Sequence, residues 1–157
     1  SVQKGVVKAM DDGVIAGYPV VDVKATLVDG SFHPVDSSGI CFEIAGGHAF
    51  SKGLKEAKPV LLEPVMKAAI TVNDEDTGEI MGDLNGKRGK ILGMNPEGNG
   101  TTIIEAEMPQ SEMLKYATDL RSITQGRGSY TLEFDHYEAV PAHLLDKVVK
   151  VKEVSFR

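Results

Sequence analysis

Glycine-lysine pairs are the first residues in this sequence that could do chemistry, because a phosphate-binding loop needs Gly, four residues, Gly-Lys and then Ser or Thr. The sequence offers two such pairs, Gly86-Lys87 and Gly89-Lys90, among its 17 glycines. Both pairs lack the first glycine and the hydroxyl. Both also follow a predicted helix instead of beginning one, so the helix dipole would not favour phosphate. We therefore expect no phosphate loop and no catalytic residue in this chain.

The cysteine and the four histidines are the next candidates, for nucleophilic catalysis or metal binding. Cys41 and His48 recur with the apolar residues of a predicted helix, so we expect both to pack in a core. We expect His136 to pack as well, on the apolar face of a predicted strand. That face also carries Tyr130, Leu132 and Phe134. No two histidines stand at the spacing of metal ligands, so we expect no metal site.

Residues 30–36, between a predicted strand and a predicted helix, place an aromatic ring next to an imidazole. A loop histidine with no evident role in a core is suited to contact a partner. The sequence supports equally well an exposed turn that binds nothing. The candidate contact residues are Gly30, Ser31, Phe32, His33 and Asp36.

A second candidate is the cluster of cations at residues 87–90, where three of four side chains are basic in an acidic protein. Such a patch could bind the phosphates of RNA. The alternative is that these exposed cations bind nothing and only interact favourably with the negative C-terminal end of the predicted helix. The candidate RNA-contact residues are Lys87, Arg88, Lys90, Arg121 and Arg127. Base stacking on a sheet is disfavoured, because the predicted strand at 101–108 carries no aromatic ring.

Two helices and one strand are predicted in residues 1–61. Apolar residues recur at helical spacing over residues 2–10, and again from a cap at 36–38 through Leu54. Residues 20–28 alternate apolar and polar side chains, which is typical of a strand with one buried face. Gly46-Gly47 interrupts the second helix and predicts close packing against a neighbour. One strand cannot bury a sheet face, so its partner is missing or a second copy pairs with residues 20–28.

The second unit is predicted to begin between Pro59 and Pro64, because proline disfavours helix at its own position and the one before. Strands are predicted at 65–72, 90–94, 101–108 and 129–137. Helices are predicted to begin at 73–74 and at 109–111, and a short helix to follow Pro141. The β-α-β-β-α-β order is that of a ferredoxin-like sandwich.

Composition limits the class of protein. The 157 residues carry a formal net charge of -6, with 41% hydrophobic and 25% charged residues, which is typical of a globular protein. No apolar run is long enough to span a membrane, and the acidic balance counts against a general nucleic-acid binder. One cysteine and no leader segment favour a reducing, cytoplasmic setting. Because the chain begins with Ser1, we expect it to be part of a longer protein.

Five segments of the sequence resemble the C-terminal part of the elongation factor G family of bacterial translational GTPases. They are AGYPVVDV at 16–23, KPVLLEPVM at 58–66, GDLNGKRG at 82–89, SEMLKYATDLRS at 111–122 and the predicted strand at 126–137. The resemblance implies an α+β fold in three parts. Residues 1–61 would be half of domain IV, a partial unit of the ribosomal protein S5 domain 2-like fold. Residues 62–140 would be the ferredoxin-like domain V, and 141–157 a C-terminal helix and tail.

The resemblance also implies a role in moving tRNA and mRNA through the ribosome after peptide transfer. The loop at 30–36 would enter the decoding centre, with His33 at the position that contacts tRNA and mRNA. Domain V would contact ribosomal RNA and the protein at the stalk base. GTP and Mg²⁺ would bind a GTPase domain outside this chain, which itself would hold no cofactor and no metal.

Two departures from the family's pattern leave alternatives open. Pro34 stands where an acidic residue is expected, and Gly46-Gly47 replaces the commoner helix sequence. Both are compatible with a paralogue specialised in ribosome recycling. The alternative from another class is a stand-alone ferredoxin-like module that binds a ligand or another protein.

Overall fold

A computed structural model describes residues 1–146 of the chain and separates it into two compact units. Of the described residues, the first unit contains Ser1–Leu61 with 141–146, and the second contains Leu62–Val140. The short helix predicted after Pro141 lies partly outside the described residues. Within them, a 3-10 turn forms at Ala142–Leu144.

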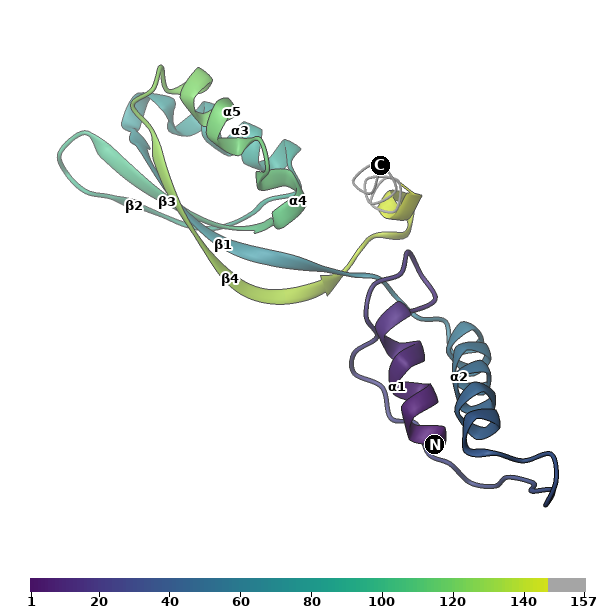
Figure 1. Ribbon diagram of the computed structural model, residues 1–157. Coiled ribbons are helices and arrows are strands. Elements are labelled where there is room, and N and C mark those ends of the chain that lie inside the picture. Colours follow the sequence, from purple (N-terminus) through teal and green to yellow (C-terminus); the bar gives the residue numbers. More distant parts are fainter. Residues whose placement is uncertain (147–157) are drawn as a thin grey trace. The chain divides into compact units, whose positions relative to one another are not determined.

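The first unit is built on two helices, α1 (Val2–Asp12) and α2 (Gly39–Glu56), which pack against each other (Figure 1). Glycines bring the two backbones into direct contact. A Cβ added to Gly5 would lie 1.8 Å from the carbonyl oxygen of Glu43, and one added to Gly46 would lie 2.9 Å from that of Val2. The predicted close approach at Gly46-Gly47 is therefore confirmed.

The strand predicted at residues 20–28 is wrong. The segment forms no strand, and Asp22 has a φ of 54°, which interrupts an extended run. Val21 and Leu27 are 60% and 69% exposed. The alternation of side chains is present, but a strand also needs a neighbour to receive its backbone hydrogen bonds. Among residues 1–146 no other segment supplies one.

Cys41 and His48, expected in a core, are also both exposed. The predicted helix is present, but the face of α2 that carries Cys41 has no covering layer within the described residues. Ile40 and Ile44 on the same helix are 67% and 54% exposed. The Cys41 thiol lies 3.1 Å from the Ser38 hydroxyl, and that hydrogen bond lowers the thiol's pKa.

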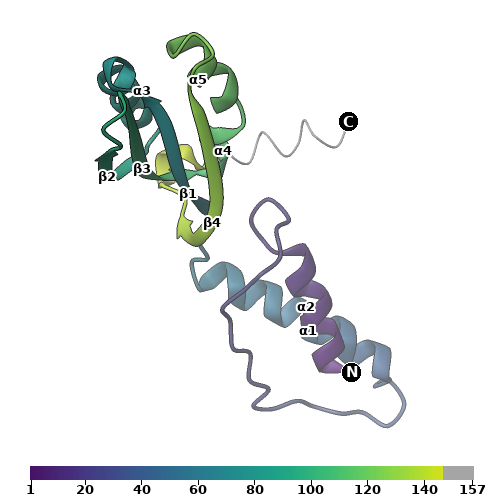
Figure 2. The same cartoon turned by 90° about the vertical axis from the view of Figure 1, so that its left-hand side faces the viewer.

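The second unit confirms the predicted ferredoxin-like order. Its elements are β1 (Leu62–Asn73), α3 (Thr77–Gly86), β2 (Lys90–Pro96), β3 (Thr101–Pro109), α4 (Gln110–Met113), α5 (Tyr116–Ile123) and β4 (Ser129–Ala139). The strands pair antiparallel in the order β2-β3-β1-β4. The helices lie on one face of the sheet, as Figures 1 and 2 show.

The core of the second unit lies between that sheet face and the helices. Alternate residues of β1 and β3 point into it, as the period of a half-buried strand requires. Ile70 and Ile104 face each other across the two strands and are fully buried. Tyr116 of α5 closes the core and meets Tyr130 edge-on, with ring centroids 5.3 Å apart.

Two details of the second unit differ from the sequence prediction. The single helix expected after Pro109 is broken at Leu114 and Lys115 into α4 and α5. The strand face expected to bury His136 also fails, because the register between β1 and β4 shifts at Val65 and Met66. His136 therefore lies on the opposite face from Leu132 and Phe134, and Phe134 is itself 56% exposed.

Within residues 1–146, no helix is both long enough and apolar enough to cross a membrane.

Candidate functional site

The loop predicted as a contact site, residues 30–36, is exposed throughout but internally ordered. The backbone N–H of His33 donates to the Ser37 hydroxyl at 2.8 Å, and the N–H of Ser37 donates back to the His33 carbonyl at 3.0 Å. This reciprocal pair closes a turn at the start of α2. These bonds fix the turn at residues 33–37, while the outer surface of the loop is open to solvent.

The side chains of this loop are presented outward. His33 and Asp36 lie with Nδ1 and Oδ2 3.2 Å apart, and their side chains are 65% and 80% exposed. Phe32 stacks on Phe42 of α2, with centroids 6.5 Å apart and planes 8° from parallel. The structure thus brings together the five predicted loop residues, and the stacked ring anchors the loop to the helix. Their contact with a partner stays a prediction.

The predicted basic cluster is organised differently, because its cations are bound by carboxylates of the same unit. Lys87 forms ion pairs with Asp83 and with Asp119, the latter at 3.2 Å. Partial burial of Lys87 lowers the pKa of its ammonium, but the hydrogen bonds to Asp83 and Asp119 outweigh this and raise it overall. Lys87 is thus a structural cation that ties α3 to α5.

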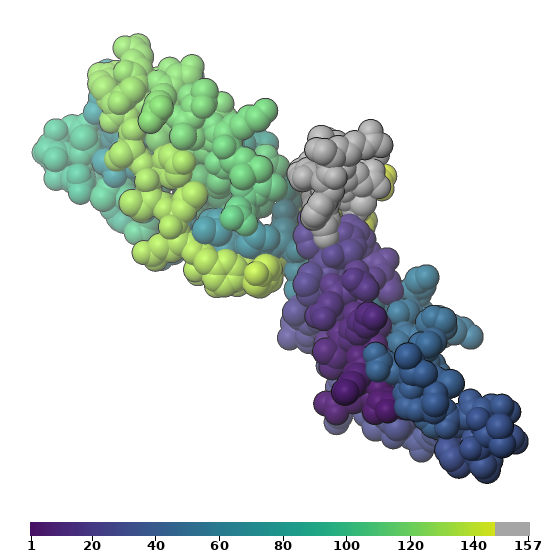
Figure 3. Space-filling model, viewed as in Figure 1, coloured from purple at the N-terminus to yellow at the C-terminus, as the bar shows by residue number. Residues whose placement is uncertain are grey.

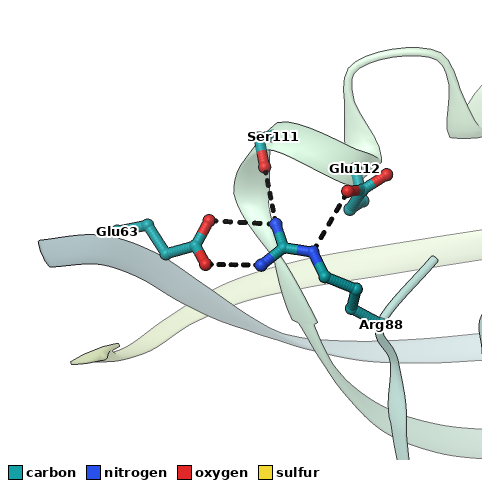
Figure 4. Close-up of polar contacts among 4 residues, drawn as sticks. All are labelled: Glu63, Arg88, Ser111 and Glu112. Atoms are coloured by element: carbon teal, nitrogen blue, oxygen red, sulfur yellow. Dashed lines mark hydrogen bonds and ion pairs between the residues drawn. The ribbon is translucent and has the colours of Figure 1, made fainter. Parts of the chain in front are cut away.

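Arg88 is held more completely, as Figure 4 shows. Its guanidinium makes a bidentate pair with Glu63 at 2.7 and 3.1 Å, and its Nε donates to Glu112 at 3.2 Å. A fourth hydrogen bond reaches the hydroxyl of Ser111 at 3.3 Å. The bond to Glu63 is the main cause that raises the pKa of Arg88. We call these four residues the Arg88 clamp; it joins the start of β1, the turn after α3 and the start of α4.

The other predicted cations are more accessible. Lys90 is 74% exposed and pairs with Glu107 at 3.3 Å. Arg127 is 48% exposed and pairs with Glu75 at 3.0 Å. Arg121 is exposed on α5, and its side chain makes no ion pair with any residue of the described chain. The five cations therefore do not form one free patch, and among the five Arg121 is the one whose side chain has no ion-pair partner within residues 1–146.

Sequence reasoning missed Glu63 and Glu112, which hold Arg88. They lie 25 and 24 residues from it, so no local pattern joins them. The alternation in β1 gave no signal for Glu63, because it has the opposite parity to the core residue Ile70. Its partner is required by its burial, since a carboxylate is almost never buried without one. Glu63 is 8% exposed.

His136, which was expected to pack on an apolar strand face, instead contacts two carboxylates. Its Nδ1 lies 2.5 Å from Asp135 Oδ2, and its Nε2 lies 2.9 Å from Glu138 Oε1. A neutral imidazole can donate through only one nitrogen, so both contacts are satisfied as hydrogen bonds by the protonated ring. The bonds to Glu138 and Asp135 raise the pKa of His136.

We expect His136→Gln to destabilise the second unit at low pH and to have little effect at high pH. A raised folded pKa gives a contribution that is complete below the unfolded pKa of about 6.5 and disappears as pH rises through the folded value. Urea unfolding of both proteins across pH 5 to 9 would measure it. A difference that stays constant or grows with pH would contradict the assignment.

Within residues 1–146 there is no group of three or more His, Cys, Asp or Glu side chains placed to hold a metal ion.

Fold and site together define a two-unit α+β protein, in which a helical unit with a projecting loop precedes a ferredoxin-like sandwich. Residues 1–58 match the family described as elongation factor G, domain IV, and residues 60–148 match the family described as elongation factor G C-terminus. The chain therefore belongs to the elongation factor G family.

Two relatives show the extent of the match. Elongation factor G of Aquifex pyrophilus is 50% identical over 149 residues, which is 95% of this chain and 21% of that protein. A crystal structure from Thermus thermophilus superposes with a TM-score of 0.80 at 42% identity, covering 97% of this chain and 23% of that one. The chain thus spans about a fifth of the length of these relatives.

Proposed function

We propose that this chain is the ribosome-contacting part of an elongation factor G-type translocase and that its loop at 30–36 reaches the tRNA and mRNA at the decoding site. The observation that supports this most is the loop itself. It is ordered by the His33–Ser37 hydrogen bonds and anchored by Phe32, yet His33 remains 65% exposed. A loop that is rigid and exposed can occupy space at a partner with little loss of conformational entropy on binding.

The second unit would anchor the factor on ribosomal RNA and on the protein at the stalk base, in the cytoplasm. GTP and Mg²⁺ would bind a GTPase domain of the longer protein, and this chain would act mechanically. Both units fall in one alignment with elongation factor G, so we set aside an unrelated ligand-binding module. A ribosome-recycling factor is the second candidate function, because Pro34 stands in the loop where an acidic residue is expected.

We expect His33→Ala, introduced into the full-length factor, to slow translocation by roughly tenfold, the loss that corresponds to about 1.4 kcal/mol in the barrier. Ribosome-stimulated GTP hydrolysis should stay close to normal, because the loop lies outside any nucleotide site. Lys52→Ala, at an exposed position of α2 outside the loop, is the matched control. Rapid-mixing kinetics of tRNA movement and of phosphate release would measure the two steps. Equal loss of both activities would sink the proposal.

Of the five cations, Arg121 is the best candidate for an RNA contact, since its side chain makes no ion pair within residues 1–146. We expect Arg121→Glu to weaken ribosome binding and to reduce the slope of log K against log salt by about 1, the effect of losing one phosphate contact. Lys90→Glu, at a cation paired with Glu107, should change the slope less. Binding measured at four salt concentrations would decide. An unchanged slope in Arg121→Glu would remove Arg121 from the interface.

A further inference from the structure

Strand β4 forms one border of the sheet of the second unit, because among the described strands it pairs only with β1 (Figure 2). Proteins usually protect a long border strand with lysine or proline, since its free N–H and C=O groups can pair with another strand. β4 is 11 residues long and contains neither lysine, arginine nor proline. No other described strand pairs with its outer N–H and C=O groups.

A bulge in β4 gathers two aromatic rings at this border. The pairing with β1 runs in one register up to Phe134 and in another from His136, so Asp135 is the extra residue. Without it, Phe134 and Tyr137 would point to opposite faces, because they are three positions apart. With it, their rings lie 5.1 Å apart, and they are 56% and 61% exposed. The yellow-green atoms of β4 lie at the surface in Figure 3.

The charge of β4 is uniformly negative apart from its histidine. Glu133, Asp135 and Glu138 are all exposed. Asp135 and Glu138 both contact the imidazole of His136, at 2.5 and 2.9 Å. Three carboxylates along one strand repel phosphate groups, so this border is not suited to RNA.

We propose that the β4 border binds an extended protein segment in which apolar and basic side chains alternate. A strand added along β4 would direct every second side chain toward the Phe134–Tyr137 pair and the intervening ones toward the carboxylates. Apolar groups match the rings, and arginine or lysine matches the carboxylates across the strand pair. Backbone hydrogen bonds supply affinity, and this alternation supplies specificity.

The probe for this site is the peptide acetyl-Val-Arg-Val-Arg-Val-Arg-Val-amide, titrated into the full 157-residue chain and followed by amide chemical shifts. We expect the shift changes to centre on β4 and β1. A peptide of the same composition with its arginines grouped together should bind at least about tenfold more weakly. The alternating peptide N-methylated at every residue should lose binding, because it can no longer donate backbone hydrogen bonds from either edge.

Matched variants separate this site from general attraction to an acidic protein. Phe134→Ser with Tyr137→Ser should weaken binding at least about tenfold, whereas Leu114→Ser, at a side chain 77% exposed on the same unit, should not. Glu133→Arg should weaken binding of the arginine peptide and improve that of a Val-Glu version. Unchanged thermal unfolding would show that each variant is folded. Equal affinity for the grouped peptide, equally tight binding of poly(U) RNA, or dimers of the chain through β4 would overturn the proposal.

Discussion

Arg88→Ala should destabilise the second unit by about 3 kcal/mol, as expected when one partner of a largely buried ion pair is removed. The substitution removes four hydrogen bonds and leaves the carboxylate of Glu63, only 8% exposed, without its cation. It also frees three segments that the clamp joins, namely the start of β1, the turn after α3 and α4. Chemical denaturation followed by the fluorescence of the tyrosines in this unit would measure the loss.

Two controls make the Arg88 prediction specific. Lys90→Ala removes a cation two residues away, but this side chain is 74% exposed, so the expected loss is about 0–0.5 kcal/mol. Arg88→Lys keeps the charge and loses the bidentate geometry, so it should recover only part of the stability. If Arg88→Ala and Lys90→Ala cost the same, the clamp does not stabilise the unit, and the basic cluster would again be available for RNA.

Gly5→Ala should disrupt the packing of the first unit, with a loss of about 3 kcal/mol or more, at the upper end of overpacking effects. A methyl group there would lie 1.8 Å from the backbone oxygen of Glu43. A backbone atom cannot turn aside as a side chain does, so α1 and α2 would have to separate. Amide hydrogen exchange in residues 2–12 and 39–56 would report the loss as faster exchange of the first unit alone.

Gly53→Ala is the matched control for this prediction. Gly53 also lies in a helix, α2, but a Cβ added there meets nothing within 4 Å. Alanine should therefore stabilise α2 by about 0.5–1 kcal/mol through its higher helix propensity. Faster exchange in Gly53→Ala, or normal exchange in Gly5→Ala, would show that helix contact through glycine does not hold the first unit together.

The second unit could be predicted from the sequence because its signals are local. Alternation in β1 and β3 and helical spacing in α3 follow from side chains that share one core. The break between α4 and α5 was not visible, since Leu114 and Lys115 both have good helix propensity. The bulge at Asp135 was not visible either, because an extra residue changes the register without changing the local pattern.

The first unit and the ion pairs were harder to predict from the sequence, since both depend on contacts between residues that are far apart in the chain. Residues 20–28 carry the pattern of a strand but have no strand beside them in the described chain. Cys41 and His48 sit on the helical stripe that was predicted, yet nothing among residues 1–146 covers it. The cations of the basic cluster can be seen in the sequence, but Glu63 and Glu112, which bind Arg88, are distant from it in sequence.

The central claim is that the loop at 30–36 reaches the tRNA and mRNA at the decoding site. A photoreactive amino acid in place of Ser31 in the full-length factor, bound to a pre-translocation ribosome, tests it most directly. The account predicts crosslinks to the mRNA, the tRNA or the small-subunit RNA of the decoding centre, and none there when the same group replaces Glu79 on α3. Crosslinks confined to other parts of the ribosome, in a factor that still translocates, would contradict it.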